Sequence, residues 1–164
     1  MNHPPPSDAA LALLKEFERG PNGSYAPTPY RCPSGHLTIG WGHVIRPSDR
    51  FFHPLSEAEA DDLLHLDVLA AVGYVGAAIG VNVPLTQSMI DALACFAFNV
   101  GQGAFLGSTL LFRLNARDYA RAADEFLRWD KATDPITGQK KRVGGLIRRR
   151  QAERDLFLRE GIPA

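Results

Sequence analysis

The spacing of apolar residues divides this chain into several helical segments and one short stretch of alternation. Apolar residues three or four positions apart, preceded by capping residues, predict helices. The predicted helices cover residues 8–19, 56–80, 86–100, 118–129 and 146–160, with a short one that begins at Ser108. Alternation with period two predicts one strand over residues 36–45. Glycine, proline and polar residues predict loops over 20–35 and 134–145.

The longest predicted helix begins with a capping box, "SEAE", in which Ser56 and Glu59 bond each other's backbone N–H groups. Its apolar positions include Leu63, Leu66, Leu69 and Val72. The order of the elements predicts an α+β, mainly helical fold with two lobes. We expect one domain over residues 1–164, made of helix 8–19 with a small antiparallel sheet lobe 20–55, a connecting helix 56–80 and a helical lobe 81–164. A cleft between the lobes is a natural ligand site.

The predicted strand combines an apolar face with a face of small residues. Leu37, Ile39, Trp41, His43 and Ile45 share the first face, and Thr38, Gly40, Gly42 and Val44 share the second. Two glycines leave a shallow groove where a substrate can approach the backbone. The Thr38 hydroxyl at its edge can orient a water molecule. A strand that merely carries glycines at bulges is the alternative interpretation.

Two further residues near this strand can carry chemistry. Glu18 lies four residues after Leu14 and therefore continues the apolar side of the first helix. Partial burial there favours a protonated carboxyl group, which can donate a proton to a leaving oxygen. Helix position alone favours the alternative, an exposed glutamate paired with Lys15 or Arg19. Cys32 precedes Thr38 by six residues across a turn, so a hairpin brings them together, although a lone cysteine is more often a buried apolar residue.

Charge is balanced overall but unevenly distributed. Residues 1–80 hold 9 acidic and 5 basic residues, a net charge of −4, and residues 81–164 hold 9 and 13, a net charge of +4. The basic half indicates an anionic partner: nucleic acid, a membrane surface or an acidic wall polymer. The runs "KKR" at 140–142 and "RRR" at 148–150 suit a solvated or wall-facing surface, with Arg149 and Glu153 as an i,i+4 pair. Without any nucleic-acid-binding motif, we expect no nucleic-acid partner.

Composition and motifs argue against cofactors and membrane insertion. His36, His43 and His53 lie near Cys32, but no paired ligand spacing accompanies them, so we expect no metal. "GWGHV" has no βαβ frame around it, so we expect no nucleotide cofactor. Two cysteines are too few for a disulfide scaffold. The sequence shows neither a signal peptide nor a transmembrane span, and we expect a cytoplasmic location until something releases the protein.

Several motifs, taken in order, resemble the phage-type lysozymes, the endolysin family of the T-even and lambdoid phages. "KEFE" followed by "YRCPSGHLTIGWGH" is similar to the N-terminal signature of that family. "PLTQSMIDALACFAFNVGQGAF" and "STLLFRLN" resemble its central helices, and "AADEFLRWDKA" with "GLIRRRQAERDLFL" resembles its C-terminal part. The resemblance covers about residues 11–158. It implies a lysozyme-like fold of two lobes joined by a long helix.

The resemblance also implies an activity: hydrolysis of the β-1,4 bond between N-acetylmuramic acid and N-acetylglucosamine in peptidoglycan. Glu18 matches the acidic catalyst of the family, and Cys32 matches a second position that is often Asp and in many endolysins Cys. Thr38 matches the family threonine. Because a thiol is a weak base at neutral pH, we expect Cys32 to position the attacking water with Thr38 rather than to take its proton. One of the two carboxylates of the usual glycosidase scheme is thus absent.

Further residues follow from the same resemblance. Gly42 and Val44 match strand positions that line the sugar cleft, Phe98 matches an aromatic residue at its mouth, and Thr109 lies near a polar cleft residue. His43 and Asp67 match a buried structural pair. Two departures concern Glu18: 13 residues separate it from Cys32, a longer interval than the family usually has, and "FER" replaces "FEG". Glu16 is therefore the fallback for the acid.

Two other functions remain open from the sequence. A lytic transglycosylase cuts the same bond without water, and the presence of both Cys32 and Thr38 argues against it. A non-catalytic wall-binding protein on the same scaffold is the other, and the retained Glu18 and Thr38 argue against it. For the hydrolase we expect bacterial peptidoglycan as the partner, holin-dependent release from the host cytoplasm to the cell wall, and a monomer.

Overall fold

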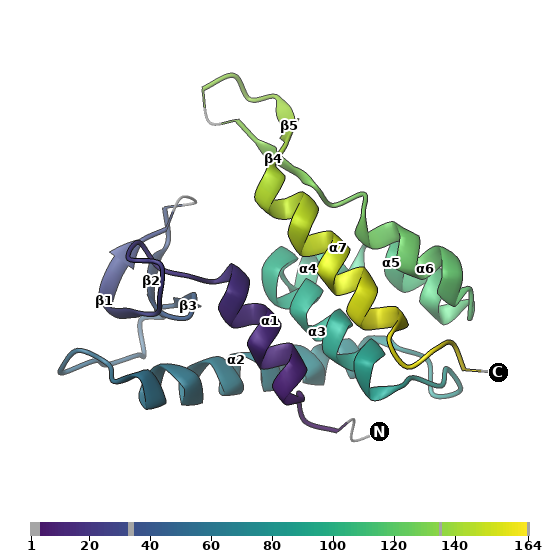
Figure 1. Ribbon diagram of the computed structural model, residues 1–164, viewed down its shortest axis with the longest axis horizontal. Coiled ribbons are helices and arrows are strands. Elements are labelled where there is room, and N and C mark those ends of the chain that lie inside the picture. Colours follow the sequence, from purple (N-terminus) through teal and green to yellow (C-terminus); the bar gives the residue numbers. More distant parts are fainter. Residues whose placement is uncertain (1–3, 33–34, 135, 164) are drawn as a thin grey trace.

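The computed structural model describes residues 4–32, 35–134 and 136–163. Its helices are α1 (Asp8–Phe17), α2 (Glu57–Ala78), α3 (Gln87–Val100), α4 (Gln102–Leu106), α5 (Thr109–Asn115), α6 (Tyr119–Phe126) and α7 (Gly144–Leu158). Its strands are β1 (Ala26–Arg31), β2 (Leu37–Gly40), β3 (His43–Val44), β4 (Lys131–Thr133) and β5 (Lys140–Arg142). The predicted α+β, mainly helical class is confirmed. Figure 1 shows a small sheet at one end of the long helix α2 and the other helices gathered around its opposite end.

The sheet lobe is an antiparallel sheet in the order β1-β2-β3. The sequence predicted a loop over 20–35, but residues 26–31 of that segment form β1. Pro27 and Pro29 lack the N–H groups that a regular ladder needs, and the register shifts between Ala26 and Tyr30. This irregular strand lies at the edge of the sheet, where missing donors are tolerated.

The strand predicted over 36–45 is two strands joined by a tight turn. Gly40 and Gly42 have φ values of +63° and +89°, a backbone conformation that glycine adopts without strain. The chain therefore reverses at Trp41–Gly42, and β2 pairs with β3 through Ile39 and His43. Because the chain turns there, the alternation predicted for one continuous strand does not hold. Gly40 faces Ala60 and Leu55 instead of a groove, whereas Gly42 faces Glu18.

The long helix α2 begins at the predicted capping box, which is confirmed at Ser56 and Glu59. Its buried stripe differs from the apolar positions noted in the sequence. The stripe consists of Ala60, Leu64, Val68, Ala71, Val72 and Val75. Leu66 is 62% exposed and Leu69 is 43% exposed. Because α2 packs against both the sheet and α3, alanine and valine fill the close contacts while two larger leucines remain at the surface.

Helix α3 forms the centre of the helical lobe, and every residue from Ser88 to Ala97 is buried. Two apolar clusters meet along it. One cluster fills the helical lobe and includes Leu93, Phe96, Phe105, Phe126 and Phe157. The other joins α1, the sheet, α2 and α3, and includes Leu14, Ile39, Trp41, Leu64 and Ile90. The two lobes that form the cleft therefore both pack against α3.

The structure changes the ends of several predicted helices and, besides β1, adds a short helix and a hairpin. Helix α1 ends at Phe17 instead of residue 19, α6 at Phe126 instead of 129, and α7 spans 144–158 instead of 146–160. The short helix α4 and the hairpin of β4 and β5 were not predicted. The hairpin turn is held by the Asp134 carboxylate, which accepts hydrogen bonds from the N–H groups of Ile136 and Thr137 and from Lys141 Nζ. Figure 1 shows this hairpin projecting beyond the N-terminal end of α7.

Replacing Ser56 with alanine should lower the free energy of unfolding by about 1 kcal/mol, because it removes the side-chain cap of α2. The Ser56 hydroxyl accepts the Glu59 N–H, and the Glu59 carboxylate accepts the Ser56 N–H. Urea denaturation measures the loss. Glu57→Ala is the control in the same turn and should cost only about 0.3 kcal/mol, its interaction with the helix dipole. Equal losses in the two variants would contradict the assigned role of the box.

Candidate active site

A cavity of about 750 Å³ lies between the sheet and the helical lobe. It is lined by residues from α1, β1, β2, β3, α3, β4 and the start of α7. Six of the predicted site residues line it: Glu18, Cys32, Thr38, Gly42, Val44 and Phe98. Other lining residues include Phe17, Tyr30, Asn99 and Leu146. Residues that are far apart in the sequence thus meet at one surface.

Glu18 is the residue that ends α1. Its backbone N–H donates to Leu14 O at 2.8 Å, and its φ of −101° and ψ of 33° take the chain out of the helix. The side chain is 19% exposed, so the predicted partial burial is observed. The insertion after Glu18 does not displace it from the cleft, because a turn with a Gly20 N–H to Ser24 O bond returns the chain into β1.

Arg149 of α7 holds the Glu18 carboxylate from the opposite lobe. Its Nη1 donates to Glu18 Oε1 at 2.5 Å, and its side chain is only 4% exposed. Burial by itself would lower the pKa of Arg149, but the nearby charges of Glu18 and Glu153 more than offset burial and raise that pKa above its ordinary value. Arg149 is therefore a permanent cation that fixes the position of the carboxylate.

The sequence prediction for the arginine run was wrong about exposure. Arg149 and Arg150 are buried, whereas a solvated surface was expected. The predicted Arg149–Glu153 pair is confirmed, with Nε donating to Oε1 at 3.0 Å. A signal for this burial was present in the sequence, because residues 149, 150 and 153 share a helical face with Leu156 and Phe157.

Cys32 and Thr38 come together through the β1–β2 hairpin. Cys32 N donates to His36 O at 3.0 Å, and Thr38 is directly opposite Tyr30 in the sheet. The Thr38 hydroxyl donates to His36 O at 3.1 Å, which leaves its lone pairs available toward the cavity. Tyr30 stays a neutral phenol at neutral pH, because burial raises its pKa, with a smaller contribution from the charges near it.

Gly42 lies against the Glu18 carboxylate. A Cβ atom at this position would lie 2.9 Å from Glu18 Oε2. Val44 of β3 and Phe98 of α3 line the same cavity. A second hollow of about 250 Å³ shares Gly42, Val44 and Phe98 with the first and extends the cleft toward Tyr74.

Thr109 does not belong to this group of residues. It is exposed at the first turn of α5, and neither of the two hollows includes it. The resemblance places it near a cleft residue; along the chain, α4 lies between α3, which lines the cavity, and α5. Its predicted contact with substrate has no support from this geometry.

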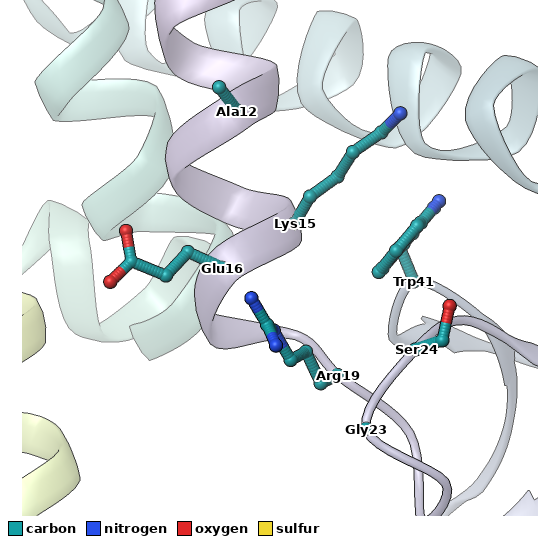
Figure 2. A pocket seen from close by; sticks show the side chains of 7 residues that line it. All are labelled: Ala12, Lys15, Glu16, Arg19, Gly23, Ser24 and Trp41. Carbon is teal, nitrogen blue, oxygen red and sulfur yellow. The ribbon is translucent and has the colours of Figure 1, made fainter.

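Glu16, the fallback for the acid, faces a different hollow. This hollow has a volume of about 470 Å³ and is lined by residues that include Lys15, Glu16, Arg19 and Trp41. Figure 2 shows Glu16 on the opposite side of α1 from Lys15 and Trp41. None of Cys32, Thr38 and Gly42 lines it. Glu18 is therefore the glutamate that the fold places with the other predicted site residues.

His43 links the sheet to α2. Its Nδ1 lies 2.7 Å from Asp67 Oδ2, and its Nε2 lies 3.1 Å from Asp49 Oδ2. The hydrogen bond with Asp67 raises the pKa of His43 above its ordinary value of 6.5; burial acts against this, and Asp49 adds to it. The sequence pointed to Asp67, but not to Asp49, which reaches His43 from the loop after β3.

Comparison with known proteins places the chain in a family. The Phage lysozyme family matches residues 22–153. The endolysin of Salmonella phage P22 is 47% identical over 133 residues, which cover 79% of this chain and 84% of that protein. The endolysin of Acyrthosiphon pisum secondary endosymbiont phage 1 is 35% identical over 151 residues, which cover 92% of this chain and 96% of that protein.

A solved structure agrees with the sequence comparison. The endolysin from Escherichia coli O157:H7 phage FAHEc1 superimposes with a TM-score of 0.81 at 30% identity and covers 99% of both chains. The chain belongs to the phage lysozyme family and is a glycoside hydrolase of that family. Within the described residues, no helix is long and apolar enough to cross a membrane.

Gly42→Ala should reduce activity about a hundredfold, because the added methyl group would displace the Glu18 carboxylate. The φ of +89° adds about 1 kcal/mol of backbone strain. Gly23→Ala is the matched control, since Gly23 has a φ of +75° but a methyl group there would meet nothing within 4 Å. Reducing-sugar release from peptidoglycan measures activity. Wild-type activity in Gly42→Ala would contradict the proposed contact with Glu18.

The His43–Asp67 contact should make stability depend on pH. A raised pKa in the folded state means that the contact stabilises the fold most below pH 6.5, the ordinary value, and that this contribution fades as pH rises through the folded value. Urea denaturation of wild type over a series of pH values on both sides of neutrality should show this decline. Asp67→Asn should flatten it. A histidine titration by NMR without an upward shift would overturn the interpretation.

Proposed function

We propose that this protein hydrolyses the β-1,4 bond between N-acetylmuramic acid and N-acetylglucosamine of bacterial peptidoglycan, with Glu18 as the general acid. The observation that carries the proposal is the meeting of Glu18, Cys32 and Thr38 at one cavity. Endolysins of two phages are similar to this chain over most of its length. A cavity of about 750 Å³ between the two lobes suits a polymeric sugar substrate.

In this mechanism the glycan lies in the cleft with its scissile oxygen at Glu18. The protonated carboxyl group donates its proton to the glycosidic oxygen as the bond to the anomeric carbon breaks. Arg149 and the Gly42 backbone confine the carboxyl group to one position, so that little reorganisation precedes the transfer. A water molecule supplies the hydroxyl group to the anomeric carbon, and its remaining proton returns to Glu18.

Cys32 and Thr38 hold that water. Thr38 offers lone pairs because its hydroxyl proton is directed to His36 O. The Cys32 side chain lies beside it at the end of the β1–β2 hairpin and can both donate and accept a weak hydrogen bond. This arrangement favours hydrolysis over a lytic transglycosylase reaction, which has no use for a bound water.

The remaining proposals concern where the protein acts. We expect a monomer, because the cleft is complete within one chain, with its lining residues drawn from both lobes. We expect the protein to wait in the host cytoplasm until a holin opens the membrane, after which it reaches the cell wall. His43, held by Asp49 and Asp67, has the structural role of fixing β3 to α2.

Replacing Glu18 with glutamine should lower lysis of outer-membrane-permeabilised Gram-negative cells at least about a hundredfold, because the amide cannot donate the catalytic proton. Turbidity measures lysis. Glu16→Gln is the matched control and should keep wild-type activity, since Glu16 faces another hollow.

The products distinguish the competing reactions. Hydrolysis releases reducing muramic acid ends, whereas a transglycosylase leaves anhydro-muramic ends. Loss of lysis in Glu16→Gln with retention in Glu18→Gln would transfer the acid role to Glu16. Sedimentation with purified walls in the absence of any bond cleavage would identify a wall-binding protein instead.

A further inference from the structure

A chain of alternating charges extends inward from Glu18 into the helical lobe. It consists of Glu18, Arg149, Glu153 and Arg150, and the last three side chains are at most 4% exposed. Only the Glu18–Arg149 contact belongs to the mechanism proposed above. The other two charges lie farther from the substrate, on the face of α7 that packs against α3.

Every polar edge of the Arg149 guanidinium has an assigned neighbour. Nη1 donates to Glu18 Oε1, Nε donates to Glu153 Oε1 at 3.0 Å, and Nη2 donates to Cys95 O at 3.5 Å. A guanidinium is planar and rigid, so two carboxylates on different edges determine its orientation. Glu153 therefore decides which way Arg149 presents Nη1 to the catalytic carboxyl group.

Arg150 continues the chain from the other oxygen of Glu153. Its Nε lies 3.2 Å from Glu153 Oε2, and its guanidinium carbon lies 4.9 Å from the centre of the Phe96 ring. Burial lowers the pKa of Arg150 to about 10, although the charge of Glu153 acts in the opposite direction. Arg150 is still charged at neutral pH. Burial raises the pKa of Glu153, and the charges of Arg150 and Arg149 act in the opposite direction.

The far end of this chain returns to the cleft at Asn99. Arg150 Nη2 donates to Asn99 Oδ1 at 2.6 Å, and Asn99 lines the same cavity as Glu18. A guanidinium has donors only, so the amide oxygen must face Arg150. The two N–H groups of Asn99 are then left for an acceptor in the cavity, such as an amide carbonyl oxygen of the glycan.

A buried ion pair is weak evidence for a stabilising role, because the cost of removing two charges from water offsets their attraction. Within the described residues, Nε and Nη1 of Arg150 and Oε2 of Glu153 also lack a hydrogen bond of good geometry. The pair is thus a costly arrangement for packing alone. Its two ends, however, each contact a group of the cleft.

We propose that Arg150 and Glu153 form a positioning pair, which orients Arg149 against Glu18 at one end and the Asn99 amide at the other. This proposal rests on the proposed hydrolysis with Glu18 as the acid. Glu153 also supplies a negative charge that offsets part of the positive charge of Arg149 and Arg150 beside Glu18. Without it, two buried cations would favour loss of the catalytic proton.

Other ionisable groups lie near this chain and do not change with the test below. Cys95 and Asp91 belong to α3, and Arg19, Tyr30, Cys32 and His36 line the same cavity as Glu18. Burial raises the pKa of the Cys95 thiol well above its ordinary value, so it stays neutral. These groups are common to wild type and variants, so a difference in pH profile reports on Glu153.

The test is the pH dependence of peptidoglycan hydrolysis by Glu153→Gln. The alkaline limb of the profile should move to lower pH by about one unit, because the variant removes a negative charge from the buried cluster. The turnover number should fall about tenfold at the optimum, because Arg149 loses one of its two orienting partners. Asp155→Asn is the control, since it removes a charge from the exposed side of the same helix and should leave the profile unchanged.

A second variant keeps the proposal testable if Glu153→Gln does not fold. Arg150→Met with Glu153→Leu removes both charges while conserving most of the volume, so a folded protein is expected. It should raise the KM, through the released Asn99 amide, and lower the turnover number, with less displacement of the pH profile. Circular dichroism and thermal unfolding verify the fold.

The outcomes separate this proposal from the proposed function. If wild type releases no reducing ends from purified sacculi, the proposed hydrolysis fails. If wild type is active but folded Glu153→Gln keeps the wild-type profile, or the folded double variant keeps wild-type kinetics, the positioning pair is rejected. If Glu153→Asp keeps the wild-type pH profile and Glu153→Gln does not, the result would further support the requirement for a charge at this position.

Discussion

The ion pair between Glu18 and Arg149 joins the first helix of the chain to the last, across 131 positions of sequence. Glu18 lines the cleft, Arg149 lies buried behind it, and each depends on packing elsewhere. Glu18 is placed by the end of α1, whose buried Leu14 packs against the sheet and α2. Arg149 is placed by α7, which packs along the buried helix α3. The pair therefore exists only when both lobes have their final arrangement.

The sheet lobe completes the site through backbone conformation rather than through bulky side chains. The turn at Trp41–Gly42 brings a residue without a side chain to the Glu18 carboxylate. Immediately after it, His43 connects to Asp49 and Asp67 and so fixes β3 to α2. Gly42 thus leaves space beside Glu18, and the next residue, His43, attaches the sheet lobe to α2.

The chain departs from a two-carboxylate glycosidase at Cys32. A thiol next to a threonine hydroxyl can hold water, but it is a weak base at neutral pH. In the proposed mechanism, catalysis then depends on Glu18 and on the groups that orient it. A single acid must be both accurately placed and protonated when the substrate binds. The positioning role proposed for the buried charges behind Arg149 meets this requirement.

Local sequence determined much of the secondary structure. Ser56 and Glu59 define the start of α2, Thr86 and Gly101 bound α3, and Ser108 and Asp118 cap the next helices. These are interactions between residues close in the chain, so short-range spacing is sufficient to predict them. The order of motifs was also enough to indicate the family, and with it Glu18, Cys32 and Thr38.

Tertiary structure decided what short-range spacing leaves open. The helical period shows which residues share a face but not what packs against that face. Arg149, Arg150 and Glu153 are charged, which favours an exposed position, and yet they are buried. The turn at Gly42 divides the segment 36–45 into two strands, so the alternation of faces predicted for one continuous strand does not hold. Thr109 was predicted from the resemblance and is not among the residues that line the cavity. Local spacing shows the helical face of the arginines, but the group that Arg149 and Gly42 both meet, Glu18, comes from a distant part of the chain, and short-range spacing cannot identify it.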